Sequence, residues 1–229
     1  MAFQGKTTKR TIGGVINNLL DTLVSLVAFV VLASIFNTLP ILVPSLFQGN
    51  MAVVISFISV IISFVFVVKL YDIAQAKYRV PIFERITLKN IIKVITTFVG
   101  MFSIEAIVSL SSTANNSLID NTMKHLHGIT LVFGVVTIVI IAPLIEEVFF
   151  RGLMFQRLSN YGLIIQITIP TLIFTLCHGP QNIREFVAYL VMASAFMATK
   201  VWTGRLQYSI ILHIFWNLLA SIPLIATIV

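Results

Sequence analysis

Three groups of polar residues in the second half of the chain combine side-chain types and spacings that suit the hydrolysis of an amide bond. Within each group two members stand four residues apart, which on a helix places them on the same face. An acid is followed by an arginine, a phenylalanine by a histidine, and a histidine by an asparagine. The members are Glu146, Glu147 and Arg151, then Phe174 and His178, then His213 and Asn217.

These side chains supply the parts that amide hydrolysis needs without a covalent intermediate. A carboxylate beside a histidine in a dry cavity can hold a water molecule and accept its proton. A second histidine and an asparagine can donate hydrogen bonds to the oxyanion of the tetrahedral intermediate. Glu146 points about 100° away from Glu147 on a helix, so one can do chemistry while the other pairs with Arg151.

Other protease chemistries are poorly represented in the sequence. There is no H-E-x-x-H zinc motif and no Gly-x-Ser setting for a serine nucleophile. Two histidines and two glutamates could bind zinc, but asparagine is a rare zinc ligand and a good oxyanion donor. We therefore expect no cofactor, with zinc held by Glu146, His178 and His213 as the alternative.

The elements that must position these residues are membrane-spanning helices. The chain of 229 residues is 58% hydrophobic and only 10% charged, whereas a soluble domain carries about 25% charged residues. We predict an all-α, multi-pass bundle of about seven spans within a single membrane domain. The predicted spans are 18–39, 51–69, 91–112, 129–158, 163–178, 185–201 and 207–229.

The Lys and Arg residues predict the orientation of this bundle and exclude one class of partner. With the N-terminus inside, all of the 15 basic residues except Lys124 and Arg184 fall on the inner side. Because the basic residues lie between apolar runs and form no single patch, the net charge of +7 does not indicate nucleic-acid binding. Residues 70–90 are predicted to form an interfacial amphipathic segment or a solvated loop.

Helix geometry allows the polar groups to meet at one depth if the hairpin of 129–158 and 163–178 extends further into the cytosol than the hairpin that precedes 207–229. If 129–158 and 163–178 form a hairpin, Glu146 and His178 lie about 22 and 26 Å from its turn. His213 and Asn217 lie about 13 and 19 Å from the turn that precedes their span. Pro143 lacks an N–H and can bend the helix one turn before Glu146.

Taken in order, the three groups resemble the signature of the CPBP family, named for CAAX proteases and bacteriocin-processing enzymes, whose bacterial members are often called Abi proteins. That signature is a Glu-Glu pair with Arg four residues after the second Glu, then Phe-x-x-x-His, then His-x-x-x-Asn or Asp. The resemblance covers about 140 to 220. It divides the chain into N-terminal spans with an interfacial segment (1–128) and a CPBP-like catalytic helical core (129–229).

The resemblance implies an intramembrane endopeptidase in which Glu146 activates water and His178 helps to hold it. His213 and Asn217 would form the oxyanion site. Supporting roles would fall to Glu147, Arg151 and Phe174. The implied partners are the lipid bilayer and a membrane-associated peptide or protein substrate. Bacterial members of the family act in peptide maturation, bacteriocin self-immunity and quorum sensing, and eukaryotic members trim CAAX proteins. The short chain and its lack of extra loops favour a bacterial member, and therefore a bacterial cytoplasmic membrane as the location.

Two other functions remain open at this point. A non-catalytic scaffold or immunity protein would keep the fold and bind a membrane partner, with the polar residues serving as interhelical hydrogen bonds. A small transporter could use embedded acids and histidines to relay protons, although the sequence shows no paired halves. Glu105 has no motif partner, and we expect it to be structural or to line the substrate path.

Overall fold

The computed structural model describes parts of residues 27–44 and then residues 46–78, 84–109 and 126–226. Every regular element within these ranges is a helix, which confirms the all-α class. The first predicted span, 18–39, lies largely outside the described residues.

Four of the described helices are long and apolar enough to cross a bilayer. They are α2 (Gly49–Tyr78), α3 (Leu88–Ser109), a continuous helix over 129–157 and α9 (Ile183–Thr203). Two further apolar helices of 15 residues each, α8 (Leu163–Cys177) and α10 (Leu206–Ala220), are shorter than a full span. The protein is therefore a multi-pass membrane bundle, while the total of seven spans and the inside N-terminus stay predictions.

Helix α2 is longer than the sequence suggested. We expected the second span to end at residue 69 and a loop or interfacial segment to follow over 70–90. Instead the helix continues to Tyr78, giving 30 residues and a length of about 45 Å. Residues 84–87 are not helical, and α3 begins at Leu88. A helix over residues 70–78 contradicts the solvated loop there, while the interfacial amphipathic segment stays a prediction.

The helix over 129–157 is continuous, but two π-helical segments interrupt its α-helical hydrogen bonding. It contains α5 (Ile129–Val136), the π-helical segment η1 (Thr137–Ile141), α6 (Ala142–Glu147), the π-helical segment η2 (Val148–Met154) and α7 (Phe155–Arg157). A π-helix pairs each carbonyl with the N–H five residues later and occurs mostly as short interruptions at functional sites. The two glutamates therefore lie between two irregular segments.

The remaining helices follow local capping signals. After the short 3₁₀ turn η3 (Ser159–Tyr161), Gly162 adopts φ 90° and α8 begins. The Asn182 side chain accepts hydrogen bonds from the Arg184 and Glu185 N–H groups and so caps the start of α9. Gly204, at φ 73°, ends α9 in the left-handed conformation that glycine adopts without strain.

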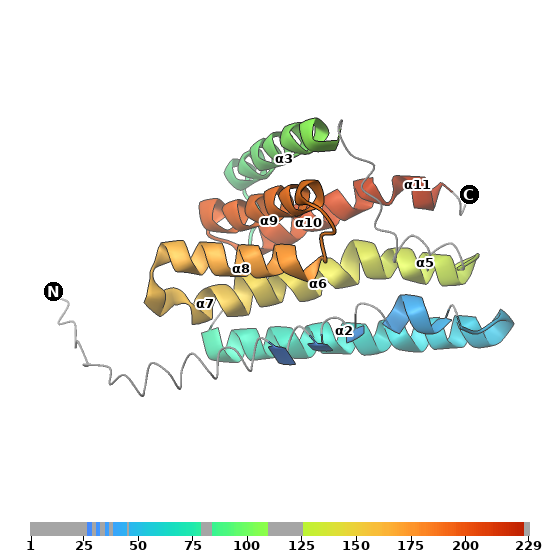
Figure 1. The fold of residues 1–229 in the computed structure, drawn as a ribbon. Coiled ribbons are helices and arrows are strands. Elements are labelled where there is room, and N and C mark those ends of the chain that lie inside the picture. Colours follow the sequence, from blue (N-terminus) through green and yellow to red (C-terminus); the bar gives the residue numbers. More distant parts are fainter. Residues whose placement is uncertain are drawn as a thin grey trace, which may run out of the picture.

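The helices pack in successive layers (Figure 1). Helix α2 lies along the 129–157 helix, α8 folds back beside that helix, and α9 with α10 separates α8 from α3. The short helix α11 (Ile222–Ile225) follows α10. Helix α9 contacts α3, α8 and α10, which makes it the central element of the second half of the chain.

The segment before α3 is held against the start of α10. The Glu84 N–H donates to Gln207 Oε1 at 2.5 Å, and Gln207 Nε2 donates back to the Glu84 carbonyl at 3.0 Å. The Thr87 N–H donates to the hydroxyl of Tyr208 at 2.9 Å, and Arg205 forms an ion pair with Glu84. These bonds fix α3 to the helix that carries His213.

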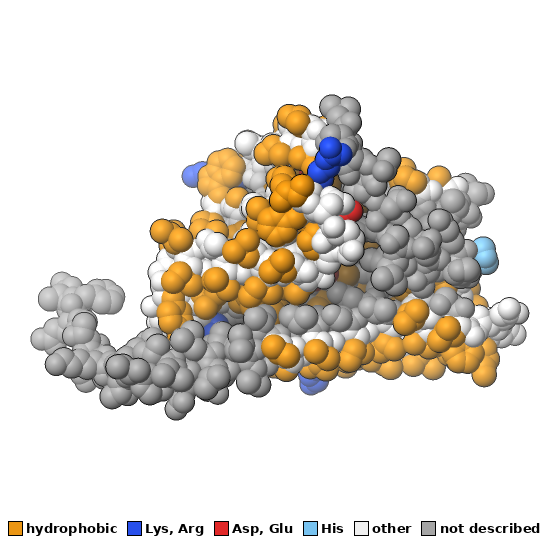
Figure 2. Space-filling model, in the orientation of Figure 1, with side chains coloured by type: hydrophobic (Ala, Val, Ile, Leu, Met, Phe, Trp, Pro, Cys, Tyr) orange, Lys and Arg blue, Asp and Glu red, His pale blue; other side chains and the backbone are white. Residues whose placement is uncertain are grey.

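The surface of the bundle is apolar, as a lipid-facing surface requires. Large hydrophobic side chains such as Phe57, Phe64 and Ile164 are exposed. Figure 2 shows hydrophobic side chains covering most of the described part of one face, with Lys and Arg at only a few points. The buried polar groups lie instead inside the bundle, because an unsatisfied polar group in hydrocarbon is costly.

Candidate active site

Glu147 and Arg151 form a fully buried ion pair at the centre of the bundle. Arg151 Nη1 donates to Glu147 Oε1 at 2.9 Å, and neither side chain is exposed. Arg151 Nη2 donates to the carbonyl of Ala193 on α9 at 2.9 Å, and its guanidinium lies 4.3 Å from the ring centre of Phe174. The pairing expected from the spacing of four residues is present, and it joins the 129–157 helix to α9.

Helix α10 supplies two more donors to the same carboxylate. His213 Nδ1 lies 2.9 Å from Glu147 Oε1, and Ser209 Oγ donates to Glu147 Oε2 at 2.5 Å. Both side chains are buried, and the His213 ring stacks on Phe196 with centres 4.2 Å apart. Because Glu147 is ionised beside Arg151, the Nδ1 of His213 carries the proton, which leaves a lone pair on Nε2.

The lone pair of His213 faces the other glutamate. His213 Nε2 lies 3.8 Å from Glu146 Oε2, which is beyond direct hydrogen-bond distance. The Glu146 side chain is 16% exposed, whereas that of Glu147 is fully buried. Adjacent acids thus have different surroundings: Glu147 accepts from three side chains and is fully buried, whereas part of the Glu146 side chain is exposed.

Phe174 and His178 complete the cluster from α8. Phe174 is fully buried, with its ring centre 5.9 Å from that of His213 and 4.4 Å from that of His178. His178 Nδ1 donates to the carbonyl of Phe174 at 2.8 Å, and the ring lies 4.8 Å from Tyr189. We expected His178 to lie close to the end of its span, and it does occupy the position just after α8.

Asn217 contacts a different part of the same helix. Its Nδ2 donates to the carbonyl of Ile138, within η1, at 2.9 Å. This bond occupies one of the two amide hydrogens that an oxyanion site would use. The structure therefore brings Glu146, Glu147 and His213 into contact, adds His178 through the ring of Phe174, and ties Asn217 to the backbone two turns before Glu146.

The sequence analysis did not identify Ser209 as part of the cluster. Ser209 lies four residues before His213, so the same spacing argument that linked His213 to Asn217 could have found it. The carbonyl of Ala193 and the ring of Phe196 carry no such signal, because only the packing of α9 brings them to Arg151 and His213.

Two further expectations concern a metal ion and Glu105. Among the residues that the structure describes, no three His, Cys, Asp or Glu side chains lie together in a way that could hold a metal ion. We therefore derive no step through a metal, and the use or absence of zinc stays a prediction. Glu105 is 8% exposed on α3, away from the three motif groups in sequence, and its role also stays a prediction.

Comparison with known proteins gives one family and one curated relative. Residues 128–219 match a family described as type II CAAX prenyl endopeptidase Rce1-like. Over 85 residues the chain is 36% identical to the membrane-embedded CAAX protease MroQ of Staphylococcus aureus (strain USA300), a match that covers 34% of this chain and 34% of that protein. No solved structure matches. The resemblance to the CPBP family is therefore confirmed, and it is carried by residues 128–219, which include all three groups of polar residues.

Proposed function

We propose that this protein is an intramembrane endopeptidase that hydrolyses a peptide bond of a membrane-associated protein or peptide with a water molecule activated by Glu146. The observation that carries the proposal is the contrast between the two adjacent glutamates. Glu147 is buried and accepts from Arg151, Ser209 and His213, whereas Glu146 is partly exposed and faces His213 Nε2 at 3.8 Å.

Glu146 and His213 can hold the attacking water between them. A water beside both groups can donate one hydrogen to Glu146 Oε2 and the other to His213 Nε2, which accepts because Nδ1–H is given to Glu147. As the water oxygen attacks the peptide carbonyl, Glu146 takes its proton and then transfers that proton to the leaving amine nitrogen. The peptide gains one water molecule, and both carboxyl groups return to their starting state.

The remaining motif residues keep this pair in position. Glu147, held by Arg151, fixes the ring of His213 through Nδ1, as a carboxylate does for a catalytic histidine. His178 has its Nδ1 committed to the carbonyl of Phe174, so its Nε2 can accept a hydrogen from the water in place of His213 Nε2. The role of His213 as an oxyanion donor, which the family resemblance implies, would require His213 to gain a proton first.

The family resemblance and the setting of the site support a proposal for the substrate class. A polar cluster buried among apolar helices suits a substrate that is itself membrane-associated. We propose bacterial peptide maturation of the bacteriocin, immunity or quorum-sensing kind, or CAAX-like processing, in the bacterial cytoplasmic membrane.

The test compares three strains that express the wild type, Glu146→Gln and Glu185→Gln at equal levels. Mass spectrometry of membrane peptides should find a fragment with the wild type and with Glu185→Gln that falls at least about 100-fold with Glu146→Gln, since general base catalysis contributes that much. Glu185 is a partly buried acid at the start of α9, where it accepts hydrogen bonds from the Gln181 N–H and from Asn182 Nδ2. It undergoes the same chemical change outside the three motif groups, so it controls for expression and folding.

A fragment that persists with Glu146→Gln would refute the role of Glu146. If the wild type yields no fragment in cells that contain the native membrane peptides, the proposal fails. Pull-down of a membrane partner that survives Glu146→Gln would then favour the non-catalytic scaffold.

A further inference from the structure

The interruption η1 leaves one backbone carbonyl of the 129–157 helix without a helical donor. The Ala142 N–H, which would serve Ile138 in an α-helix, donates to the carbonyl of Thr137. The next candidate, five residues after Ile138, is Pro143, which has no N–H. The carbonyl of Ile138 therefore needs a partner from outside its own helix, since a bilayer offers no water to supply one.

Asn217 supplies that partner. Its Nδ2 donates to the carbonyl of Ile138 at 2.9 Å, across 79 residues of sequence. Asn217 stands one helical turn after His213 on α10, and Ile138 stands two turns before Glu146. Helix α10 is thus attached to the 129–157 helix at two points, His213 to Glu147 and Asn217 to Ile138.

We propose that Asn217 is also a positioning residue: the amide hydrogen that it donates to Ile138 completes the backbone of η1, so that the helix presents Glu146 to His213. An added residue in one helical turn rotates everything that follows it, so the stability of η1 sets the direction in which Glu146 points. This inference rests on the proposed function for its catalytic consequence. The energetic coupling between Asn217 and Pro143 does not depend on the proposed function.

The coupling can be measured because Pro143→Ala introduces an N–H that can donate to the carbonyl of Ile138. In that background the helix can satisfy Ile138 itself, and the Asn217 amide becomes dispensable. A double-mutant cycle therefore compares Asn217→Ala in the native and the Pro143→Ala backgrounds. Pro170→Ala is the matched control, since Pro170 also lies inside a helix, α8, but far in sequence from Ile138.

The first measurement is the thermal unfolding midpoint of the purified full chain in detergent. We expect Asn217→Ala to lower the midpoint by about 3–6 °C in the native and Pro170→Ala backgrounds. In the Pro143→Ala background the loss should be less than half as large. Equal losses in all three backgrounds would overturn the proposal, whatever the protein does as an enzyme.

The second measurement is the yield of the membrane-peptide fragment described above. Asn217→Ala should lower the yield, and adding Pro143→Ala should raise it again by about tenfold or more. An oxyanion donor cannot be replaced by a backbone N–H at position 143, so a loss of yield that Pro143→Ala leaves unchanged would overturn the positioning role. If the wild type itself gives no fragment, the proposed function fails. The double-mutant cycle of unfolding midpoints still tests whether Asn217 and Pro143 are coupled.

A third variant covers the case in which Pro143→Ala does not fold. Asn217→Asp keeps the shape of the side chain and can donate to Ile138 only when its carboxyl group is protonated. Relative to the wild type at the same pH, its unfolding midpoint should exceed that of Asn217→Ala at about pH 4 or below. Identical midpoints for the two variants at that pH would contradict the proposal.

Discussion

Helix α2 and the helix over 129–157 have nearly the same length, and both are apolar enough to span a membrane. They differ in how their polar groups find hydrogen-bond partners. Helix α2 is α-helical from Gly49 to Tyr78. Its two fully buried serines, Ser56 and Ser63, donate to the carbonyls of Ala52 and Phe36. A regular helix satisfies its own backbone, so only small hydroxyl groups need partners inside the bilayer.

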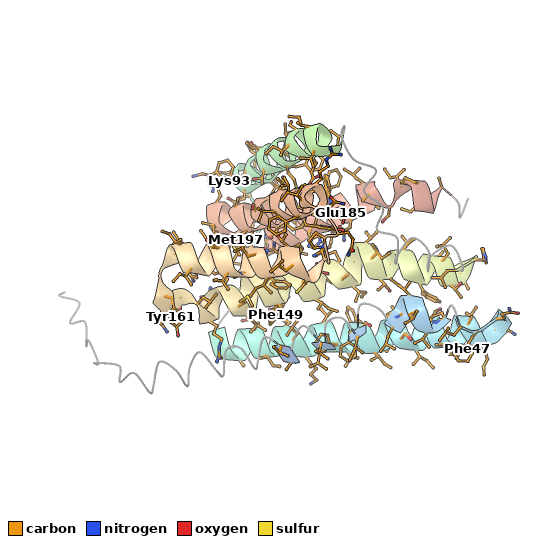
Figure 3. All side chains as sticks on the ribbon, in the orientation of Figure 1. Phe47, Lys93, Phe149, Tyr161, Glu185 and Met197 are labelled. Atoms are coloured by element: carbon orange, nitrogen blue, oxygen red, sulfur yellow. The ribbon has the colours of Figure 1, made fainter. Side chains whose placement is uncertain are left out.

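The 129–157 helix carries charges and irregular backbone, and both need partners on other helices. Glu147 and Arg151 are bonded to Ser209, His213 and Ala193 of α9 and α10. Figure 3 labels two of the buried hydrophobic side chains, Phe149 on η2 and Met197 on α9. The conformation of the 129–157 helix therefore depends on its neighbours, whereas that of α2 depends mainly on its own sequence.

Removing one partner of the buried ion pair should produce the largest effect. Arg151→Ala leaves Glu147 as an uncompensated charge inside the bundle, which should lower the free energy of unfolding by about 3–5 kcal/mol. Lys69→Ala removes a cation from α2, but Lys69 is exposed, and the change should stay within about 0.5 kcal/mol. Denaturant titration of both variants in mixed micelles measures the difference, and equal losses would erase the contrast between the two helices.

The same contrast explains what the sequence predicted well. The fifth and sixth spans, expected over 163–178 and 185–201, match α8 and α9 closely because apolar runs, Gly162 and Asn182 mark their ends. The pairing of Glu147 with Arg151 followed from their spacing. These features depend on residues that are near one another in the chain, which is where spacing arguments hold.

The features that the sequence analysis missed depend on distant residues. Segment η1 arises where Pro143 removes an N–H and Asn217, on another helix, supplies a replacement donor. The choice between a bond to the fourth or the fifth residue is therefore settled by packing, which hydrophobic periodicity does not encode. Placement of His213 next to Glu146 likewise follows from how α10 packs on α6.

An intermediate effect on the free energy of unfolding is expected for Ser209, the uncharged residue of α10 that donates to Glu147 of the buried ion pair. Ser209→Ala removes a hydrogen bond to the ionised Glu147, which should cost about 1.5–3 kcal/mol. The loss should also reduce the yield of the membrane-peptide fragment, since Glu147 helps to orient His213. Ser209→Thr keeps the hydroxyl and serves as the control; if it loses as much stability as Ser209→Ala, packing and not the hydrogen bond explains the cost.

The smallest effect should come from α2, where the two buried serines differ in one respect. Ser56 donates to Ala52 within its own helix, so Ser56→Ala should change the free energy of unfolding by less than about 0.5 kcal/mol. Ser63 donates to Phe36 on a separate segment at 2.7 Å, so Ser63→Ala should cost about 1 kcal/mol. Paired denaturant titrations test this order. A larger cost for Ser56→Ala would mean that hydrogen bonds within one helix contribute as much to the free energy of unfolding as hydrogen bonds between segments. The contacts of the 129–157 helix with its neighbours would then not set it apart from α2.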